Sequence, residues 1–339
     1  MRSTGLLDLQ VNGYAGVDFN TTALTPDAFD HALRAMLNAG VTACLPTLIT
    51  APEDILAARI ATLDQAVARS RLGPSMVLGY HLEGPFLNPT PGYAGCHPAL
   101  AMVDPDPALL HRISVGLTRQ ILLLTLAPER DGAMALISWA RAEGLLVAMG
   151  HTSADAATVT RAVESGVTLS THLGNALPQP QPKFLNPLMA QLAEDRLTAT
   201  FIADGIHIPP DALKVLLRAK GLERSILVTD ATAAAAAPVG LYEFAGMSIE
   251  RAADGTVRTP GSQVLAGSAL CLDQAVRNIV KWGLAPEASA IAMASDCPAA
   301  VLQPALDRHG VQRPDSWVEW TDDLRPIAIS IGGMMISPA

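Results

Sequence analysis

The chain has 339 residues, of which 50% are hydrophobic and only 16% are charged, so it can bury a large core and is not a disordered protein. Its net charge of −9 argues against nucleic acid or an anionic membrane as a partner. A small anionic ligand stays compatible with this charge, because one cationic pocket can exist on an acidic protein.

Short apolar runs alternate with amphipathic helices along the chain. Leu6–Val11 is the first predicted strand, and Thr25-Pro26 is typical of an N-cap followed by proline, which opens a helix that Gly40 ends. A strand at Thr42–Ile49 and a helix at Glu53–Ser70 come next. The remaining predicted strands are Ser75–Glu83, Gln120–Leu126, Leu145–His151, Leu169–Leu173, Ala199–Asp204 and Ser225–Asp230. Two further helices are predicted between these strands, at Asp131–Glu143 and Ala154–Ser165.

The C-terminal third has a different pattern. Ala231–Ala237 is rich in alanine and is interpreted as a loop or a frayed helix, without functional meaning. Helices at Ala269–Trp282 and Pro286–Ala294 are expected to complete the main domain. Ser316–Trp320 and Pro326–Ile331 alternate in polarity and predict two short strands outside it.

Eight strand–helix units within about 230 residues predict a closed (β/α)₈ barrel of the TIM type. The alternative is an open doubly wound sheet, but no glycine-rich phosphate fingerprint follows the first strand. We expect residues 1–305 to form the barrel and residues 306–339 to form a short C-terminal β segment.

Four residues stand at the carboxyl ends of predicted strands: Glu83, His151, His172 and Asp230. In a closed barrel these ends converge on one mouth, where active sites lie. Glu83 and the two histidines supply three ligands for a divalent cation and leave one position for water. Asp230 is then available to take the proton of the water and give it to a leaving nitrogen, so the pattern predicts hydrolysis of an amide or related C–N bond.

Each of these residues also has a purely structural interpretation. A lone histidine at a strand end is more often a hydrogen-bonding core residue than a ligand. Glu83 precedes Gly-Pro and fits a turn cap, and Asp230 fits the cap of a following helix. Four metal-compatible residues at the same end of four strands are harder to explain in this way, which favours a metal site.

Seven motifs lie in order between residues 7 and 268, within a resemblance that runs from Leu6 to about Gln303. They are Leu7–Gly13, His81–Asn88, Gly150–Ser153, Thr171–Ala176, Ile202–His207, Leu227–Ala231 and Leu265–Ser268. This set resembles the N-acetylglucosamine-6-phosphate deacetylases of the amidohydrolase superfamily. The resemblance implies that Glu83, His151 and His172 are the metal ligands and that Asp230 is the general base and acid.

The resemblance also implies a substrate site. His97, in Gly95–Pro98, matches the histidine that helps to polarise the acetyl carbonyl, and Asn175, Ala176 and His207 match positions that hold the sugar phosphate. Without the family pattern, His97 and His207 fit hydrogen bonding in a core or a turn equally well.

Many superfamily members bind two metals through a His-x-His motif after the first strand. Here the motif is Gln10-Val11-Asn12, a form that some members of the resembling family share, and neither side chain is a good zinc ligand. Predicted strand four also has no lysine that carbamylation could turn into a bridging ligand. We therefore expect one divalent metal ion, with zinc as the first candidate and iron, cobalt or manganese as alternatives.

Three features depart from the family pattern. In the family, several strands before the barrel build a small β-sandwich together with C-terminal strands. This chain starts almost at the first barrel strand, so the sandwich is expected to be absent or reduced to Ser316–Ile336. Lys183 stands in a proline-rich stretch where an arginine often holds phosphate, and a lysine lacks the bidentate geometry of arginine. The segment Pro89–Ala94 is stiffened by two prolines and looks remodelled.

The leading functional hypothesis is hydrolysis of the N-acetyl amide of N-acetylglucosamine 6-phosphate to glucosamine 6-phosphate and acetate. A deacylase or cyclic amidase acting on another N-acyl amino sugar or small amide, without phosphate recognition, is the alternative. A third hypothesis is a barrel that binds an amino sugar without catalysis, although an intact set of four site residues argues against it. The family is commonly dimeric, so a homodimer is expected.

The expected location is the cytoplasm. No apolar run reaches the roughly 18 to 20 residues that span a bilayer, and no signal-like stretch follows the N-terminus. The cysteines are far apart and form no CxxC pair, which fits free thiols in a reducing compartment. They are Cys44, Cys96, Cys271 and Cys297.

Overall fold

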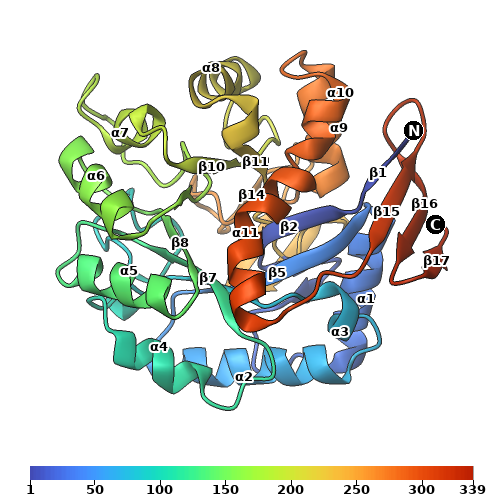
Figure 1. Ribbon diagram of the computed structural model, residues 1–339, viewed down its shortest axis with the longest axis horizontal. Coiled ribbons are helices and arrows are strands. Elements are labelled where there is room, and N and C mark those ends of the chain that lie inside the picture. The colour runs from blue at the N-terminus through green and yellow to red at the C-terminus, as the bar shows by residue number, and fades with distance from the viewer. Residues whose placement is uncertain (339) are drawn as a thin grey trace.

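The computed structural model describes residues 1–338, and its centre is a nearly closed barrel of eight parallel strands (Figure 1). The barrel strands are, in chain order, β2 (Leu6–Val11), β5 (Val41–Ile49), β6 (Tyr80–Glu83), β7 (Ile121–Leu126), β8 (Leu146–Met149), β9 (Leu169–Ser170), β10 (Thr198–Phe201) and β11 (Ser225–Leu227). In the sheet, each of these strands is hydrogen-bonded to the barrel strands that come before and after it in the chain. The predicted (β/α)₈ barrel is confirmed.

The barrel closes between β2 and the segment after β11. Val11 forms a parallel bridge with Ala231. The amide of Asp230 donates to the carbonyl of Gln10 at 2.9 Å, and the amide of Asn12 donates to the carbonyl of Ala231 at 2.7 Å. These bonds place the polar residues of the first strand directly beside Asp230.

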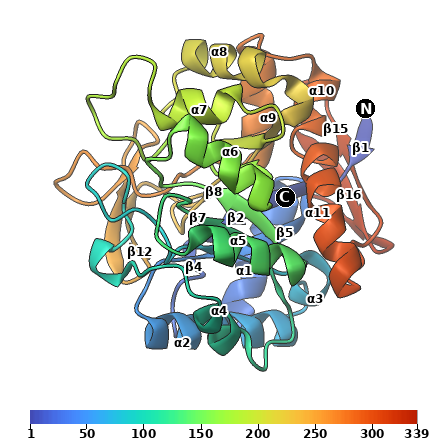
Figure 2. The ribbon, with the colours of Figure 1, turned by 60° about the vertical axis from the view of Figure 1, so that its left-hand side comes forward.

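Helices surround the barrel on its outer side (Figures 1 and 2). They are α1 (Pro26–Asn38), α2 (Glu53–Arg69), α4 (Pro107–Ser114), α5 (Ala133–Ala142), α6 (Ala156–Ser165), α7 (Pro187–Ala193), α8 (Pro210–Lys220), α9 (Leu272–Lys281) and α10 (Glu287–Ala292). Short 3₁₀ turns occur at Ala99–Ala101 and Leu222–Arg224. As predicted, α1 begins after Thr25, whose hydroxyl accepts the amide hydrogen of Ala28, and its apolar face is buried on the barrel.

One predicted strand is partly wrong. Ser75 and Met76 belong to a short helix, α3 (Gly73–Met76), and the strand of this unit begins only at Tyr80. Pro74 explains the difference, because its fixed φ suits the first turn of a helix and its nitrogen has no hydrogen for a strand ladder.

Several segments of regular structure have no counterpart in the sequence prediction, and the two largest follow β11. A three-stranded antiparallel sheet, β12 (Gly240–Phe244), β13 (Met247–Arg251) and β14 (Val257–Arg258), follows β11. Helix α11 (Asp296–His309) contacts β2, β7, β8 and β11 and lies across the barrel in Figure 1. The amide of Leu7, near the start of β2, donates to the carbonyl of Ala294 just before this helix, and Gly144, just before β8, lies against Arg308 of the helix. The helix therefore covers the amino-terminal end of the barrel and leaves the opposite end open.

A small antiparallel sheet stands beside the barrel. Its order is β1 (Arg2–Thr4), β15 (Ser316–Trp320), β16 (Pro326–Ile331) and β17 (Met334–Ile336). The two strands predicted in the tail are confirmed, and the N-terminal residues join them. A two-stranded ribbon, β3 (Gly13–Tyr14) with β4 (Val17–Asp18), follows β2. The division of the chain into a barrel and a separate segment after residue 305 stays a prediction.

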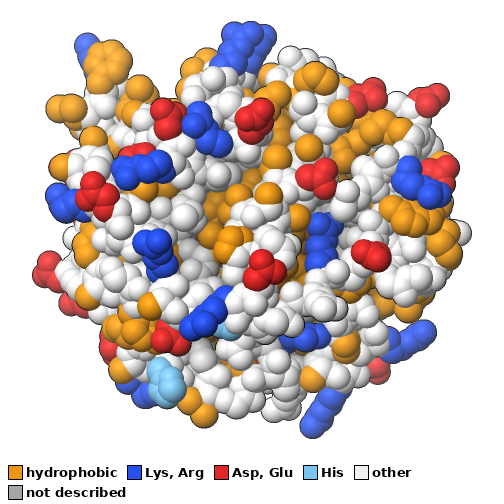
Figure 3. All heavy atoms as spheres, in the orientation of Figure 1, with side chains coloured by type: hydrophobic (Ala, Val, Ile, Leu, Met, Phe, Trp, Pro, Cys, Tyr) orange, Lys and Arg blue, Asp and Glu red, His pale blue; other side chains and the backbone are white. Residues whose placement is uncertain are grey.

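The surface carries dispersed charges. On the face seen in Figure 3, lysine and arginine side chains alternate with acidic ones around apolar areas, and neither sign dominates. Among residues 1–338, no helix combines the length and apolarity needed to cross a membrane.

Replacement of Asp64 tests a buried polar anchor of the fold. Its carboxylate, 5% exposed, accepts hydrogen bonds from Tyr80 Oη at 2.7 Å, from the amide and hydroxyl of Thr118 and from the amide of Arg119. We expect Asp64→Ala to lower the free energy of unfolding by about 3 kcal/mol, because these donors lose their partner.

Chemical denaturation would measure the loss. The matched control is Asp54→Ala, an exposed position on the same helix, which should change stability by less than about 0.5 kcal/mol. Equal stability of both variants would contradict the anchoring role.

Candidate active site

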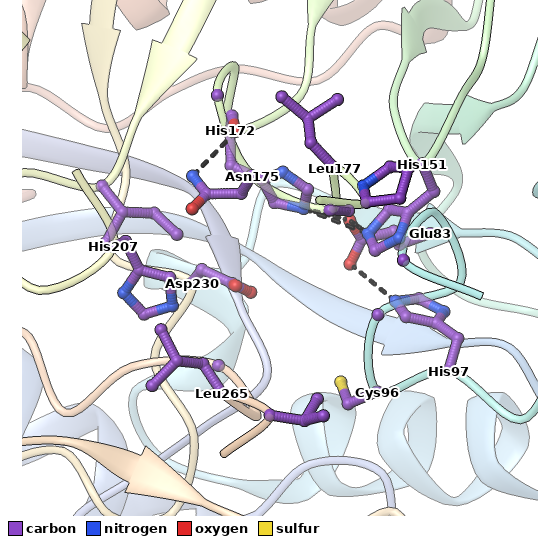
Figure 4. Close-up of a pocket in the computed structure, with 18 of the residues that line it drawn as sticks. Glu83, Cys96, His97, His151, His172, Asn175, Leu177, His207, Asp230 and Leu265 are labelled. Atoms are coloured by element: carbon purple, nitrogen blue, oxygen red, sulfur yellow. Dashed lines mark hydrogen bonds and ion pairs between the residues drawn. The ribbon is translucent and has the colours of Figure 1, made fainter. Parts of the chain in front are cut away.

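The open end of the barrel contains a cavity of about 740 Å³. All eight residues that the sequence singled out line it, together with residues of the loop after β9 and of the hairpin after β11 (Figure 4). They are Glu83, His97, His151, His172, Asn175, Ala176, His207 and Asp230. The convergence of strand ends therefore brings together residues that are up to 147 positions apart, from 83 to 230.

Three of these residues have a left-handed backbone just after their strands end. The φ angles are 50° for His151, 29° for His172 and 48° for Asp230. Non-glycine residues adopt this region at a cost of roughly 1–3 kcal/mol, and such residues cluster at functional sites. Hydrogen bonds hold them: the amide of His172 donates to Thr200 Oγ1 at 2.7 Å, and that of Asp230 donates to Gln10.

Glu83, His151 and His172 form a compact cluster of possible ligand atoms. Glu83 Oε1 lies 2.9 Å from His172 Nε2 and 3.3 Å from His151 Nε2, and the two nitrogens are 3.2 Å apart. A tetrahedral site with ligand distances of about 2.0–2.1 Å separates its ligand atoms by about 3.3–3.4 Å. The spacing of the three atoms therefore fits a divalent cation.

The tautomer of His151 also suits metal binding. Its Nδ1 donates to the carbonyl of Tyr93 at 2.8 Å, so in the neutral ring Nε2 has a lone pair. That lone pair faces His172 Nε2 and Glu83 Oε1. The carbonyl comes from the segment Pro89–Ala94, which thus orients a candidate ligand.

His97 is close to the same cluster but has a different hydrogen-bonding state. The candidate ligand atoms of Glu83, His97 and His151 lie within 4.8 Å of one another. However, the amide of Thr50 donates to His97 Nδ1 at 3.4 Å, and burial followed by the nearby His151 lowers the pKa of His97 to about 4. The ring is therefore neutral with its hydrogen on Nε2, which lies 3.6 Å from Glu83 Oε2 and is able to donate a hydrogen bond.

The two carboxylates of the cavity have opposite pKa shifts. Burial opposes the ionisation of Glu83, but the neighbouring side chains of His151, His172 and His97 hold its pKa well below the usual value. Burial and the charge of Glu83 raise the pKa of Asp230 to about 6. Glu83 is thus a permanent anion suited to a cation, and Asp230 can exchange a proton near neutral pH.

Asp204 is a site residue that the sequence prediction missed, although it stands in the Ile202–His207 motif. Its Oδ2 lies 2.6 Å from His207 Nδ1, and its Oδ1 accepts the amide hydrogens of Ile206 and His207. The carboxylate fixes both the turn and the ring, so that Nε2 of His207 is left for the cavity (Figure 4). The Asp-Gly-x-His spacing is the sequence signal for this pair.

The loop after β9 supplies polar groups but no cation to the wall. Asn175 Nδ2 donates to the carbonyl of His172 at 2.9 Å, and Ala176 has a φ of 52°. Lys183 is exposed on this loop and is not among the lining residues. Within residues 1–338, the cavity lining contains neither lysine nor arginine.

A barrel with these groups at its open end defines the class of the protein: it is an amidohydrolase, an enzyme that hydrolyses an amide bond. The chain is 34% identical over 296 residues to an N-acetylgalactosamine-6-phosphate deacetylase of Escherichia coli O157:H7, covering 87% of this chain and 76% of that protein. It is 35% identical over 312 residues to an N-acetylglucosamine-6-phosphate deacetylase of Bos taurus, covering 88% and 73%. No protein-family model matches the chain.

The fold gives the same result. A mutant of N-acetyl-D-glucosamine-6-phosphate deacetylase from Mycobacterium smegmatis, solved in complex with N-acetyl-D-glucosamine-6-phosphate, superimposes with a TM-score of 0.83 at 28% identity, covering 98% of this chain and 86% of that one. The chain belongs to the N-acetylglucosamine-6-phosphate deacetylase family. The resemblance inferred from the motifs is confirmed.

Asp204→Asn tests the orientation of His207. The amide would place a donor against His207 Nδ1 and reverse the tautomer of the ring, so we expect kcat/KM for amide hydrolysis to fall by about 10- to 100-fold. Steady-state kinetics with metal analysis would measure this, and metal content should not change. Asp211→Asn, at an exposed position nearby in α8, is the control; an equally active Asp204→Asn enzyme would contradict the role.

Proposed function

We propose that this enzyme hydrolyses the N-acetyl amide of N-acetylglucosamine 6-phosphate and releases glucosamine 6-phosphate and acetate. The observation that carries the proposal is the position of Asp230, a carboxylate with a pKa of about 6, in the same buried cavity as the Glu83–His151–His172 cluster. The names of the relatives support the phosphorylated amino sugar, and they do not favour a deacylase without phosphate recognition.

Glu83, His151 and His172 would hold one divalent metal ion. Their two imidazoles and one carboxylate suit zinc first and iron, cobalt or manganese as alternatives. When bound, the metal polarises the acetyl carbonyl and makes water a stronger nucleophile. The tautomer of His151 and the spacing of the three ligand atoms support this set.

The other residues of the cavity would bind substrate and move protons. Asp230 accepts the proton of the attacking water and then delivers it to the leaving nitrogen. His97 donates its Nε2 hydrogen to the acetyl oxygen, where negative charge develops. His207, Asn175 and Ala176 hold the sugar phosphate at the wall formed by the loops after β9 and β10.

We also propose a cytoplasmic homodimer. Free cysteines throughout residues 1–338 support a reducing compartment. Phe184 and Leu185, 75% and 91% exposed, project from the loop after β9 and support self-association. Light scattering of the purified protein would measure the mass in solution.

Asp230→Asn tests the base. We expect kcat to fall by about 10²- to 10⁴-fold with metal content unchanged, because the amide cannot accept a proton. In the wild type, protonation of Asp230 should lower kcat/KM below about pH 6, and a bound cation would move this limb to lower pH. The limb should be absent from the variant. Near-normal turnover of Asp230→Asn would show that another group is the base.

A substrate panel combined with elemental analysis tests the function as a whole. We expect one divalent ion per chain and the highest kcat/KM for amine release from N-acetylglucosamine 6-phosphate. Relatives are named for either N-acetylglucosamine 6-phosphate or N-acetylgalactosamine 6-phosphate. Comparing kcat/KM for these two sugars tests whether the enzyme recognises the configuration of the 4-hydroxyl. Unphosphorylated N-acetylglucosamine should have a much lower kcat/KM. Equal kcat/KM for the phosphorylated and unphosphorylated sugars would contradict phosphate recognition.

A further inference from the structure

Strand β2 presents a row of buried polar side chains to the inside of the barrel. Asp8 and Gln10 of the strand and Asn12 directly after it alternate along the chain, so they share one face, and they are 0%, 2% and 1% exposed. Barrel interiors are usually filled with branched apolar residues, and buried polar groups need partners. The amides of Gln10 and Asn12 donate to Asp230, and the carboxylate of Asp8 accepts from Thr229, so all three side chains bond to residues about 220 positions further along the chain.

Gln10 and Asn12, the two residues of this row nearest the cavity, both bond to one carboxylate oxygen of Asp230. Asn12 Nδ2 donates to Asp230 Oδ1 at 2.7 Å, and Gln10 Nε2 donates to the same oxygen at 3.2 Å. The opposite orientation of either amide would bring its carbonyl oxygen against the carboxylate, so the donors must face it. Within residues 1–338, no hydrogen bond reaches Oδ2, which is left for the cavity.

Asp8, the first residue of this row, bonds to the turn that contains Asp230. Asp8 accepts hydrogen bonds from Thr229 Oγ1 at 2.5 Å, from the amide of Thr229 at 3.3 Å and from that of Gln10 at 3.2 Å. The hydroxyl of Thr229 in turn accepts the amide hydrogen of Ala231 at 3.1 Å. The residues before and after Asp230 are thus bound to one anchor, which stabilises its left-handed backbone.

We propose that Asp8, Gln10 and Asn12 form a positioning row for the general base: the two amides occupy Oδ1 and so select Oδ2 as the oxygen that takes the proton, while Asp8 holds the turn. The inference rests on the proposed role of Asp230 and assigns a function to the Gln-x-Asn motif. These are positioning residues, because Gln10 and Asp8 do not line the cavity.

Gln10→Met is the direct test, since it removes one donor and keeps the volume of a side chain that does not line the cavity. We expect kcat to fall by about tenfold, because a hydrogen bond to a charged group is lost, while KM and metal content stay at the wild-type values. Gln303→Met, on the opposite side of the barrel in α11, is the control and should have wild-type kinetics.

A double variant separates positioning from general structural support. If Gln10 acts through Asp230, Gln10→Met should cause no further loss of the residual turnover in an Asp230→Asn background. Asn12→Leu should behave in the same way for kcat, although KM can also change because Asn12 lines the cavity.

Two results overturn the inference. An equal loss of kcat in both backgrounds, or loss of metal in Gln10→Met, shows a general structural role and leaves the proposed function intact. Normal turnover of Asp230→Asn alone overturns the assignment of the base and the positioning row together. The two failures are therefore distinguishable.

Discussion

The closure of the barrel between β2 and the segment after β11 is the constraint on which the site depends. Backbone hydrogen bonds join Gln10 to Asp230 and Asn12 to Ala231 across the seam. They place the first strand against a residue about 220 positions away and turn the carboxylate of Asp230 towards the Glu83–His151–His172 cluster. An open sheet would leave β2 and β11 at opposite edges, and the same side chains would not meet.

The proposed chemistry depends on two carboxylates in one buried cavity having widely different pKa values. Histidine hydrogen bonds keep Glu83 ionised, and its negative charge, after burial itself, helps to raise the pKa of Asp230. The anionic Glu83 is therefore suited to bind a cation, and Asp230, whose pKa lies near neutral pH, is suited to the proposed role of base. The histidines that surround Glu83 also leave Asp230 as the carboxylate with an oxygen open to the cavity.

Features that depend on residues close together in the sequence, or on barrel topology alone, could be predicted from the sequence. The strand Leu6–Val11 and the start of α1 have local signals, namely a short, mostly apolar run and a Thr-Pro cap, and the structure has them at the predicted bounds. The site residues were predictable because barrel topology alone makes strand ends converge. The helix at Ser75 was missed because a local proline outweighed an apolar run. Asp8 was missed because its partner Thr229 lies 221 residues further along the chain. Asp204 has a local signal in the Asp-Gly-x-His spacing, which the prediction did not use.

The Gln-x-Asn motif also bears on the number of metal ions. Here both side chains direct amide hydrogens at Asp230 Oδ1, and partially positive donors on that side oppose a second cation there. The donors stabilise the carboxylate without fixing it as a ligand, so that it stays able to carry a proton. The amides of Gln10 and Asn12 therefore support the proposal of a single metal beside Glu83, with Asp230 as the base.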